Sequence, residues 1–147
     1  MSYPTEPDFI VVKVGDGATP EVFTTICGME GASINKTVNT SDRFRRDCAK
    51  PGQVPTRKVK VTGKQWDATA PGVINVDEFA NFDASLGVRK NYQFDFGIRD
   101  GTDAGSIIGT YEGPGVMTAQ NINLSGDEGS AEITIAGEDE IVWTAAS

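Results

Sequence analysis

The balance between β-branched residues and leucine constrains the fold of this chain more than any other feature of its sequence. The 147 residues include 13 Val, 11 Ile and 14 Thr, but only 2 Leu. β-branched side chains lose rotamer freedom in helices and pack well on pleated sheets. The 17 Gly and 7 Pro supply the turns that a strand-rich fold requires. The composition therefore predicts a mainly β protein.

The length of the chain, 147 residues, fits one domain. A chain of this size buries roughly two-thirds of its unfolded surface, so its core needs no disulfide or metal. We expect residues 1–147 to form a single domain. The sequence has neither the run of about 18 apolar residues that crosses a membrane nor the N-terminal pattern of a signal peptide. It therefore predicts no membrane association.

Alternating apolar and polar residues mark about eight strands between glycine-rich turns. The clearest strand covers residues 88–99, where Tyr92, Phe94 and Phe96 share one face and polar residues occupy the other. We expect a turn at Gly113-Pro114-Gly115. The other expected strands cover residues 8–14, 22–27, 32–38, 57–63, 106–112, 116–124, 131–136 and 141–143.

One segment, about residues 76–86, has the pattern of an α-helix. Asn75 is a candidate N-cap, Glu78 lies in the capping-box position, and Gly87 follows as a stop. The expected apolar stripe consists of Val76, Phe79, Phe82 and Leu86. Together with the strands, this segment predicts a β-sandwich or partly closed barrel with one flanking α-helix.

A long polar stretch, about residues 39–54, interrupts the strand pattern. Loops longer than about a dozen residues in a compact domain are usually functional or disordered, so we expect a binding role here. Charge gathers in the same region, because residues 43–64 contain eight basic residues and one acidic residue, a net charge of +7. The whole chain carries −8, and the nine charged residues after Arg99 are all acidic. Because a head-to-tail interface joins two different patches of one protein, this polarity favours self-association.

Residues that carry catalysis or hold metals are scarce in this sequence. The absence of His removes the usual triad, the His general base and the His metal ligand. Cys27 lies in a strand pattern and is interpreted as a buried thiol, while Cys48 has no base to pair with. Residues 100–103 resemble a fragment of a calcium loop but lack the alternating ligands of an EF-hand. The sequence predicts no enzyme, with no catalytic, cofactor-binding or metal-binding residues.

Specific nucleic-acid binding is also disfavoured. The net charge is −8, and Phe44 is the one aromatic residue within the basic run. Single-stranded nucleic acids are usually held by several stacking aromatics in a positively charged groove. The basic residues therefore favour a protein partner over a specific DNA partner.

Several short segments follow one another in a distinctive order along nearly the whole chain. They are residues 9–14, 22–31, 32–35, the polar stretch 39–54, residues 59–67 with Gly63-Lys64-Gln65-Trp66-Asp67, residues 109–113 and residues 141–144. In this order, they resemble a major tail tube protein of a long-tailed (siphovirus-type) bacteriophage or of a phage-derived particle.

The resemblance implies a β-sandwich with a flanking helix that polymerises as hexameric rings stacked head to tail. Such rings form a tail tube, a conduit for DNA ejection into the host, through which DNA passes without specific binding in an acidic lumen. The implied location is the virion, assembled in the host cytoplasm. The implied partners are further copies of this chain and other tail proteins: the tape measure, the terminator and the distal tail protein. Residues 1–7 would be a flexible arm that orders only in the assembly.

Within this interpretation, the polar loop and the strand that follows it are expected to contact neighbouring subunits. The predicted inter-subunit residues are Arg43, Arg45, Arg46, Lys50, Arg57, Lys58 and Lys60. They would meet acidic groups from the region of residues 100–140. Two alternatives stay open: a tail-completion or head–tail connector protein that forms one closed ring, and a monomeric β-sandwich module that binds sugars or proteins.

Overall fold

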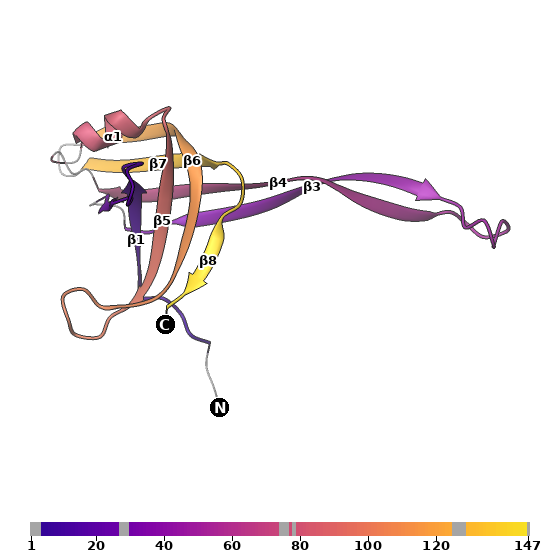
Figure 1. The fold of residues 1–147 in the computed structure, drawn as a ribbon, viewed down its shortest axis with the longest axis horizontal. Coiled ribbons are helices and arrows are strands. Elements are labelled where there is room, and N and C mark those ends of the chain that lie inside the picture. The colour runs from indigo at the N-terminus through magenta and orange to yellow at the C-terminus, as the bar shows by residue number, and fades with distance from the viewer. Residues whose placement is uncertain (1–3, 27–29, 74–76, 78, 125–128, 147) are drawn as a thin grey trace.

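Eight antiparallel strands and one short helix make up the described part of the chain (Figure 1). The computed structural model describes residues 4–26, 30–73, 77, 79–124 and 129–146. The elements are β1 (Phe9–Gly15), β2 (Phe23–Thr25), β3 (Ser33–Arg45), β4 (Thr56–Val73), α1 (Phe79–Ser85), β5 (Arg89–Ile98), β6 (Ser106–Leu124), β7 (Gly129–Gly137) and β8 (Val142–Ala145). The prediction of a mainly β fold with one flanking helix is confirmed.

The strands belong to one open sheet that folds over on itself. Their order is β2-β1-β5-β6-β7-β4-β3, and β8 pairs with β6. β6 joins the two halves, because its first part pairs with β5 and β8 and its second part pairs with β7. Trp66 on β4 meets Phe94 on β5 at a ring-centroid distance of 6.4 Å, although two strands separate them in the sheet order. The sheet therefore forms the two layers of a β-sandwich.

The core lies between these layers. Trp66 is 1% exposed, and its indole covers Gly137, where a Cβ would overlap the ring. The indole N–H donates to the carbonyl oxygen of Glu138 at 3.2 Å. The other fully or nearly buried apolar residues are Val12, Val14, Ile26, Ala68, Ala70, Tyr92, Phe94, Met117, Ala131, Ile133 and Ile135. Tyr92 and Phe94 thus face the core, as the alternation in their strand predicts.

The helix α1 covers Phe79–Ser85, within the predicted range of about 76–86, and the structure does not describe residues 76 and 78. The predicted cap residues Asn75 and Glu78 and the stripe residue Val76 lie outside the residues that the structure describes. Leu86, expected in the apolar stripe, is exposed instead. Gly87 has a φ of 75° and donates its N–H to the carbonyl of Met117 at 2.9 Å. Because glycine tolerates this left-handed conformation, the predicted stop at Gly87 is confirmed.

The predicted turn at Gly113-Pro114-Gly115 is wrong, because β6 runs straight through it. A Cβ on Gly113 would lie 3.1 Å from the Trp66 indole, and one on Gly115 would lie 2.9 Å from the carbonyl oxygen of Ala136. Glycine fits at these two positions because β6 approaches neighbouring residues too closely for a side chain. The two strands predicted on either side, residues 106–112 and 116–124, are halves of one strand.

The loop predicted at about residues 39–54 is shorter in the structure. Residues 39–45 continue β3, and β4 begins at Thr56, so the connection covers residues 46–55. The alternation that identifies a strand requires one buried face. Here both faces of the strand pair are largely exposed, and polar side chains hide the pattern.

The phenol of Tyr92 gives a stability prediction. Its side chain is fully buried, its oxygen has no hydrogen-bond partner among the described residues, and burial raises its pKa to about 12. A buried polar group without a partner costs about 1–3 kcal/mol, so Tyr92→Phe is expected to stabilise the fold by about 1 kcal/mol. Urea denaturation should show a higher midpoint with an unchanged slope. A lower midpoint would mean that the hydroxyl has a partner in solution.

Candidate functional site

A two-stranded arm projects from the body of the molecule (Figure 1). It consists of residues 38–64, in which β3 and β4 pair from Val38↔Lys64 to Arg45↔Thr56. β4 pairs with β7 only from Asp67 onward, so this part of the ribbon has no third strand among the described residues. An isolated two-stranded ribbon is marginally stable in water. The arm is therefore a surface that lacks the covering layer a sheet normally has.

One face of the arm is apolar. The register places Phe44, Val59 and Val61 on one face, with exposed fractions of 72%, 50% and 56%. A β-bulge lies on this stretch, because Asn39 pairs with Gly63 but Thr40 pairs with Val61. The extra residue shifts the alternation of β4, so that Val59 and Val61 lie on the same face as the core residue Trp66. The apolar face of the arm thus continues the core face of the body into solvent.

The opposite face of the arm is cationic. It carries Arg43, Arg45, Lys58 and Lys60, and the register sets Arg43 directly opposite Lys58. Like charges directly opposite each other destabilise a strand pair. An anionic partner laid on this face would relieve the repulsion. Four of the seven basic residues predicted for an interface are therefore brought together on one surface.

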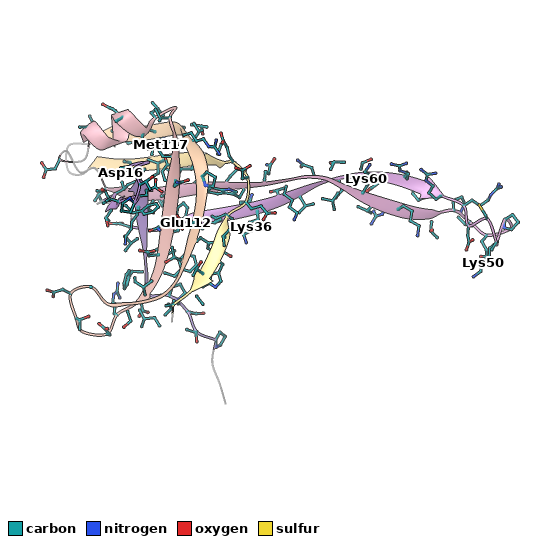
Figure 2. All side chains as sticks on the ribbon, viewed as in Figure 1. Asp16, Lys36, Lys50, Lys60, Glu112 and Met117 are labelled. Carbon is teal, nitrogen blue, oxygen red and sulfur yellow. The ribbon has the colours of Figure 1, made fainter. Side chains whose placement is uncertain are left out.

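The other three predicted residues lie elsewhere on the arm. Arg46 and Lys50 belong to the connection at the tip, and Figure 2 shows Lys50 there with Lys60 midway along the arm. Arg57 lies on the apolar face, 3.9 Å from the carboxylate of Asp42. Cys48 is an exposed free thiol of the tip. The seven predicted residues therefore lie in three places: four on the cationic face, two at the tip, and Arg57 on the apolar face.

An acidic groove lies beside the root of the arm. Its volume is about 390 Å³, and the described residues that line it include two carboxylates and no Lys or Arg. The lining residues are Asn91, Glu112, Gly113, Pro114, Glu140, Val142 and Thr144. Glu140 also contacts Lys64 at 3.6 Å in an exposed pair. Exposed pairs of this kind contribute about 0–1 kcal/mol, so Glu140 stays available to another cation.

Other acidic residues of the C-terminal half are used within the chain. Arg89 binds Glu138 at 2.7 Å and Asp139 at 3.3 Å. Asp100 accepts hydrogen bonds from Thr102 and Ser106, and these lower the pKa of Asp100 to about 2. This geometry stabilises a turn after β5. Of the acidic residues in the expected region, Asp100, Glu138 and Asp139 are therefore engaged within the chain, and Glu112 and Glu140 line the groove.

Aromatic residues anchor the root of the arm to the body. Phe96, Tyr111 and Trp143 form a cluster with ring centroids 5.0–5.9 Å apart. The ammonium of Lys36, on β3, lies 4.6 Å from the centroid of the Tyr111 ring, a cation–π contact. Sequence reasoning missed this cluster, because its members come from three strands far apart in the sequence. Trp66 is buried in the core and cannot serve as part of a sugar-stacking platform.

The polar face of β5 is partly covered. Asp95 is 5% exposed, pairs with Lys13 of β1 at 2.8 Å and accepts a hydrogen bond from Thr110 of β6 at 2.7 Å. These contacts join three neighbouring strands across the outer face of the layer. The sequence predicts this face as polar. Its carboxylate Asp95 is paired and buried, so the face is not an open binding site.

The described residues also lack two features that other classes of protein carry. No helix among them has the length and apolar character that crossing a membrane requires. Within the same residues, no three His, Cys, Asp or Glu side chains gather as a metal site would need.

Comparison with known proteins identifies the fold. No family model and no curated protein sequence matches the chain. Among solved structures, a chain from the tail of an empty gene transfer agent particle, refined with C6 symmetry, matches with a TM-score of 0.59 and 21% identity over 92% of this chain and 96% of that chain. A chain from the sheath/tube terminator of PVC, an extracellular contractile injection system, matches with a TM-score of 0.63 and 16% identity, over 99% of both chains.

The SPP1 tail tube also matches, with a TM-score of 0.62 and 9% identity over 97% of this chain and 80% of that chain. These matches cover nearly the whole sequence, while the identities are low. They show that the chain has the fold found in tail and tube proteins of phage-like particles.

Proposed function

We propose that this protein is the subunit of a phage-type tail tube, which polymerises as hexameric rings stacked head to tail. The observation that carries the proposal is the arm, which projects from the body with both faces uncovered. A monomeric protein gains nothing from a ribbon that exposes apolar side chains on one face and crowded cations on the other. A subunit of a polymer covers both when its neighbours bind. The fold shared with tail and tube proteins supports this role, and C6 symmetry of one such tail supports the hexamer.

The charge distribution along the chain supports a role as the wall of a tube. The whole chain carries −8 and residues 43–64 carry +7, so the remaining residues carry −15. An acidic lumen wall repels phosphates, so DNA passes without being held by counterion release. The protein would act structurally and not as an enzyme, within the virion, after assembly in the host cytoplasm. Tape measure, terminator and distal tail proteins would be its partners, and residues 1–7 an arm that orders on assembly.

One alternative has a specific observation behind it. The fold also matches a chain from a sheath/tube terminator, so a connector that forms a single closed ring is the second candidate. The two candidates differ in one property, because a tube subunit elongates without limit and a connector ring does not. Electron microscopy at increasing protein concentration distinguishes them.

The apolar face of the arm provides a test of the proposed function. Phe44→Ser combined with Val59→Thr and Val61→Thr is expected to reduce assembly about tenfold or more, because the apolar area that neighbours would bury is removed. The three side chains are exposed in the monomer, so the body should keep its stability. Assembly is measured by pelleting and negative-stain microscopy beside the wild type. Tubes of normal length and yield from the triple variant would contradict the proposal.

A matched control uses apolar residues exposed elsewhere. Ile122 and Leu124 lie at the end of β6, away from the arm, and are also exposed. Thr at both positions removes a comparable apolar area and is expected to leave assembly intact. Loss of assembly in both variants would assign the effect to general solubility and not to the arm.

A further inference from the structure

The strand β8 is weakly held at the edge of the sheet. All four of its residues, Val142–Ala145, are exposed, and in the described part of the chain it pairs with β6 alone. Elements with little buried surface open locally far more easily than the core does. β8 is therefore able to leave β6 while the body stays folded.

One side chain anchors this strand. The Trp143 indole covers Gly109, where a Cβ would overlap the ring. Its centroid lies 5.4 Å from that of Phe96 and 5.0 Å from that of Tyr111. Trp143 is 43% exposed and does not belong to the buried core. Release of β8 would therefore uncover the aromatic cluster and the edge of β6 without opening the core.

The connection between β7 and β8 contains a hinge. Asp139 has a φ of 52°, and no other non-glycine residue in the described ranges has a positive φ. This conformation is uncommon for a residue with a side chain, and such positions cluster in segments that switch. Glu138, just before it, is fixed to the body, because its N–H donates to the carbonyl oxygen of Pro114 at 2.8 Å and its own carbonyl oxygen accepts from Trp66. The movable unit therefore begins at residue 139, and residues 139–145 are called the strap below.

The root of the arm fastens the strap. Lys64 of β4 contacts the carboxylate of Glu140 at 3.6 Å. Lys36 of β3 lies 4.6 Å from the ring centroid of Tyr111, a ring that the strap helps to cover. The register places both lysines on the core-facing side of the ribbon, and Figure 2 shows Lys36 at its root. A rotation of the arm therefore moves both contacts together.

We infer that the root of the arm holds the strap closed in the free subunit, and that the strap opens when the arm binds a neighbouring subunit. This inference rests on the proposed function and adds a conformational step to it. The ribbon is paired over its whole length, so a rotation imposed on the arm turns Lys36 and Lys64 away from the strap. While the strap is closed, the free subunit presents only a four-residue edge strand, and natural sheets use short edge strands to limit edge-to-edge aggregation.

A disulfide that prevents opening tests the inference. Glu112 and Val142 lie directly opposite each other on β6 and β8, within the Cα separation that a disulfide spans. The variant E112C/V142C also carries C27S/C48S, so that no other thiol is present. Oxidised protein is expected to assemble about tenfold less than reduced protein, because the closed state is then fixed. Pelleting measures assembly, and thiol titration verifies the disulfide.

A matched disulfide away from the strap is the control. Asn121 and Glu132 lie directly opposite each other on β6 and β7, and both are exposed. N121C/E132C, in the same C27S/C48S background, is expected to assemble equally well when oxidised and when reduced. Normal assembly of oxidised E112C/V142C would overturn the inference. Equal loss in both oxidised variants would also overturn it, because the effect would then belong to the sheet as a whole.

Hydrogen exchange tests the fastening in the free subunit. K36A/K64A removes both contacts of the arm root and is expected to speed exchange of the backbone amides of residues 142–146 about fivefold, since exposed cation–π contacts and ion pairs are individually weak. K58A/K60A removes two lysines further out on the arm and should leave this exchange unchanged. Mass spectrometry of the C-terminal peptide measures the rate. Unchanged exchange in K36A/K64A would contradict the fastening.

The two measurements separate this inference from the proposed function. If the wild type forms no tubes but exchange in the strap responds to K36A/K64A and not to K58A/K60A, the tube function fails and the fastened strap stands. If oxidised and reduced E112C/V142C form tubes equally well, the tube function stands and the opening of the strap fails.

Discussion

Trp66→Ala is expected to lower the free energy of unfolding by about 3–5 kcal/mol, the range for removing a large aromatic side chain from a core. Trp66 is 1% exposed, and its indole packs edge-on against Phe94 at 6.4 Å. It also covers Gly137, on the strand next to its own. The substitution therefore removes the side chain that joins the two layers of the sandwich and leaves a cavity that neither layer can close alone. Urea denaturation followed by circular dichroism measures the loss.

Trp143→Ala is the matched control, because this tryptophan is 43% exposed and lies at the surface cluster. It should cost much less than Trp66→Ala. Gly137→Ala tests the same contact from the other side. The added Cβ would overlap the Trp66 indole, and overpacking of this kind typically costs about 1–3 kcal/mol. Combined with Trp66→Ala, the added methyl group enters the cavity, so the two losses should not add. Additive losses would contradict the packing described for this pair.

Excision of the arm is expected to abolish assembly while the body stays folded. Val38 and Lys64 are paired across the ribbon, so a two-residue Asn-Gly turn can join them and replace residues 39–63. The removed segment lies outside the buried core, and its apolar side chains are exposed. The free energy of unfolding should therefore change by about 1 kcal/mol or less, as is usual for changes at exposed sites. Tubes and rings should disappear.

Sedimentation velocity and negative-stain microscopy measure the effect of excision, and urea denaturation verifies the body. A variant in which the same turn replaces only the tip, between Arg45 and Thr56, keeps both faces of the arm and serves as the control. It should retain most of the assembly. Normal tubes from the fully excised protein would show that the arm is not the joining element.

Most strands of the body can be predicted from the sequence, because a strand with one buried face alternates apolar and polar residues. The alternation in residues 88–99 predicts a strand with Tyr92 and Phe94 on its core face, and both residues are buried. Within the arm, the sequence predicts a strand at residues 57–63 but a loop at residues 39–54, because neither face of residues 39–45 is buried and no alternation marks them. The glycines on either side of Pro114 predict a turn, but in the structure they lie where β6 passes too close to neighbouring residues for a side chain to fit. Composition alone does not distinguish these two uses of glycine.

The basic residues of the interface could be found in the sequence, but their arrangement could not. The bulge between Asn39 and Thr40 decides which side chains of β4 share a face, and no sequence signal fixes its position. The groove likewise depends on the pairing of β6 with β8, which brings Glu112 opposite Val142 and close to Glu140. Contacts between such distant segments are set by the fold and not by local pattern.

Electron microscopy of the purified wild-type protein over a range of concentrations tests the central claim most directly. The account predicts hollow tubes of stacked six-fold rings, with a length that increases with concentration. A protein that stays monomeric at every concentration, even when it is produced together with the other tail proteins of its particle, would contradict it.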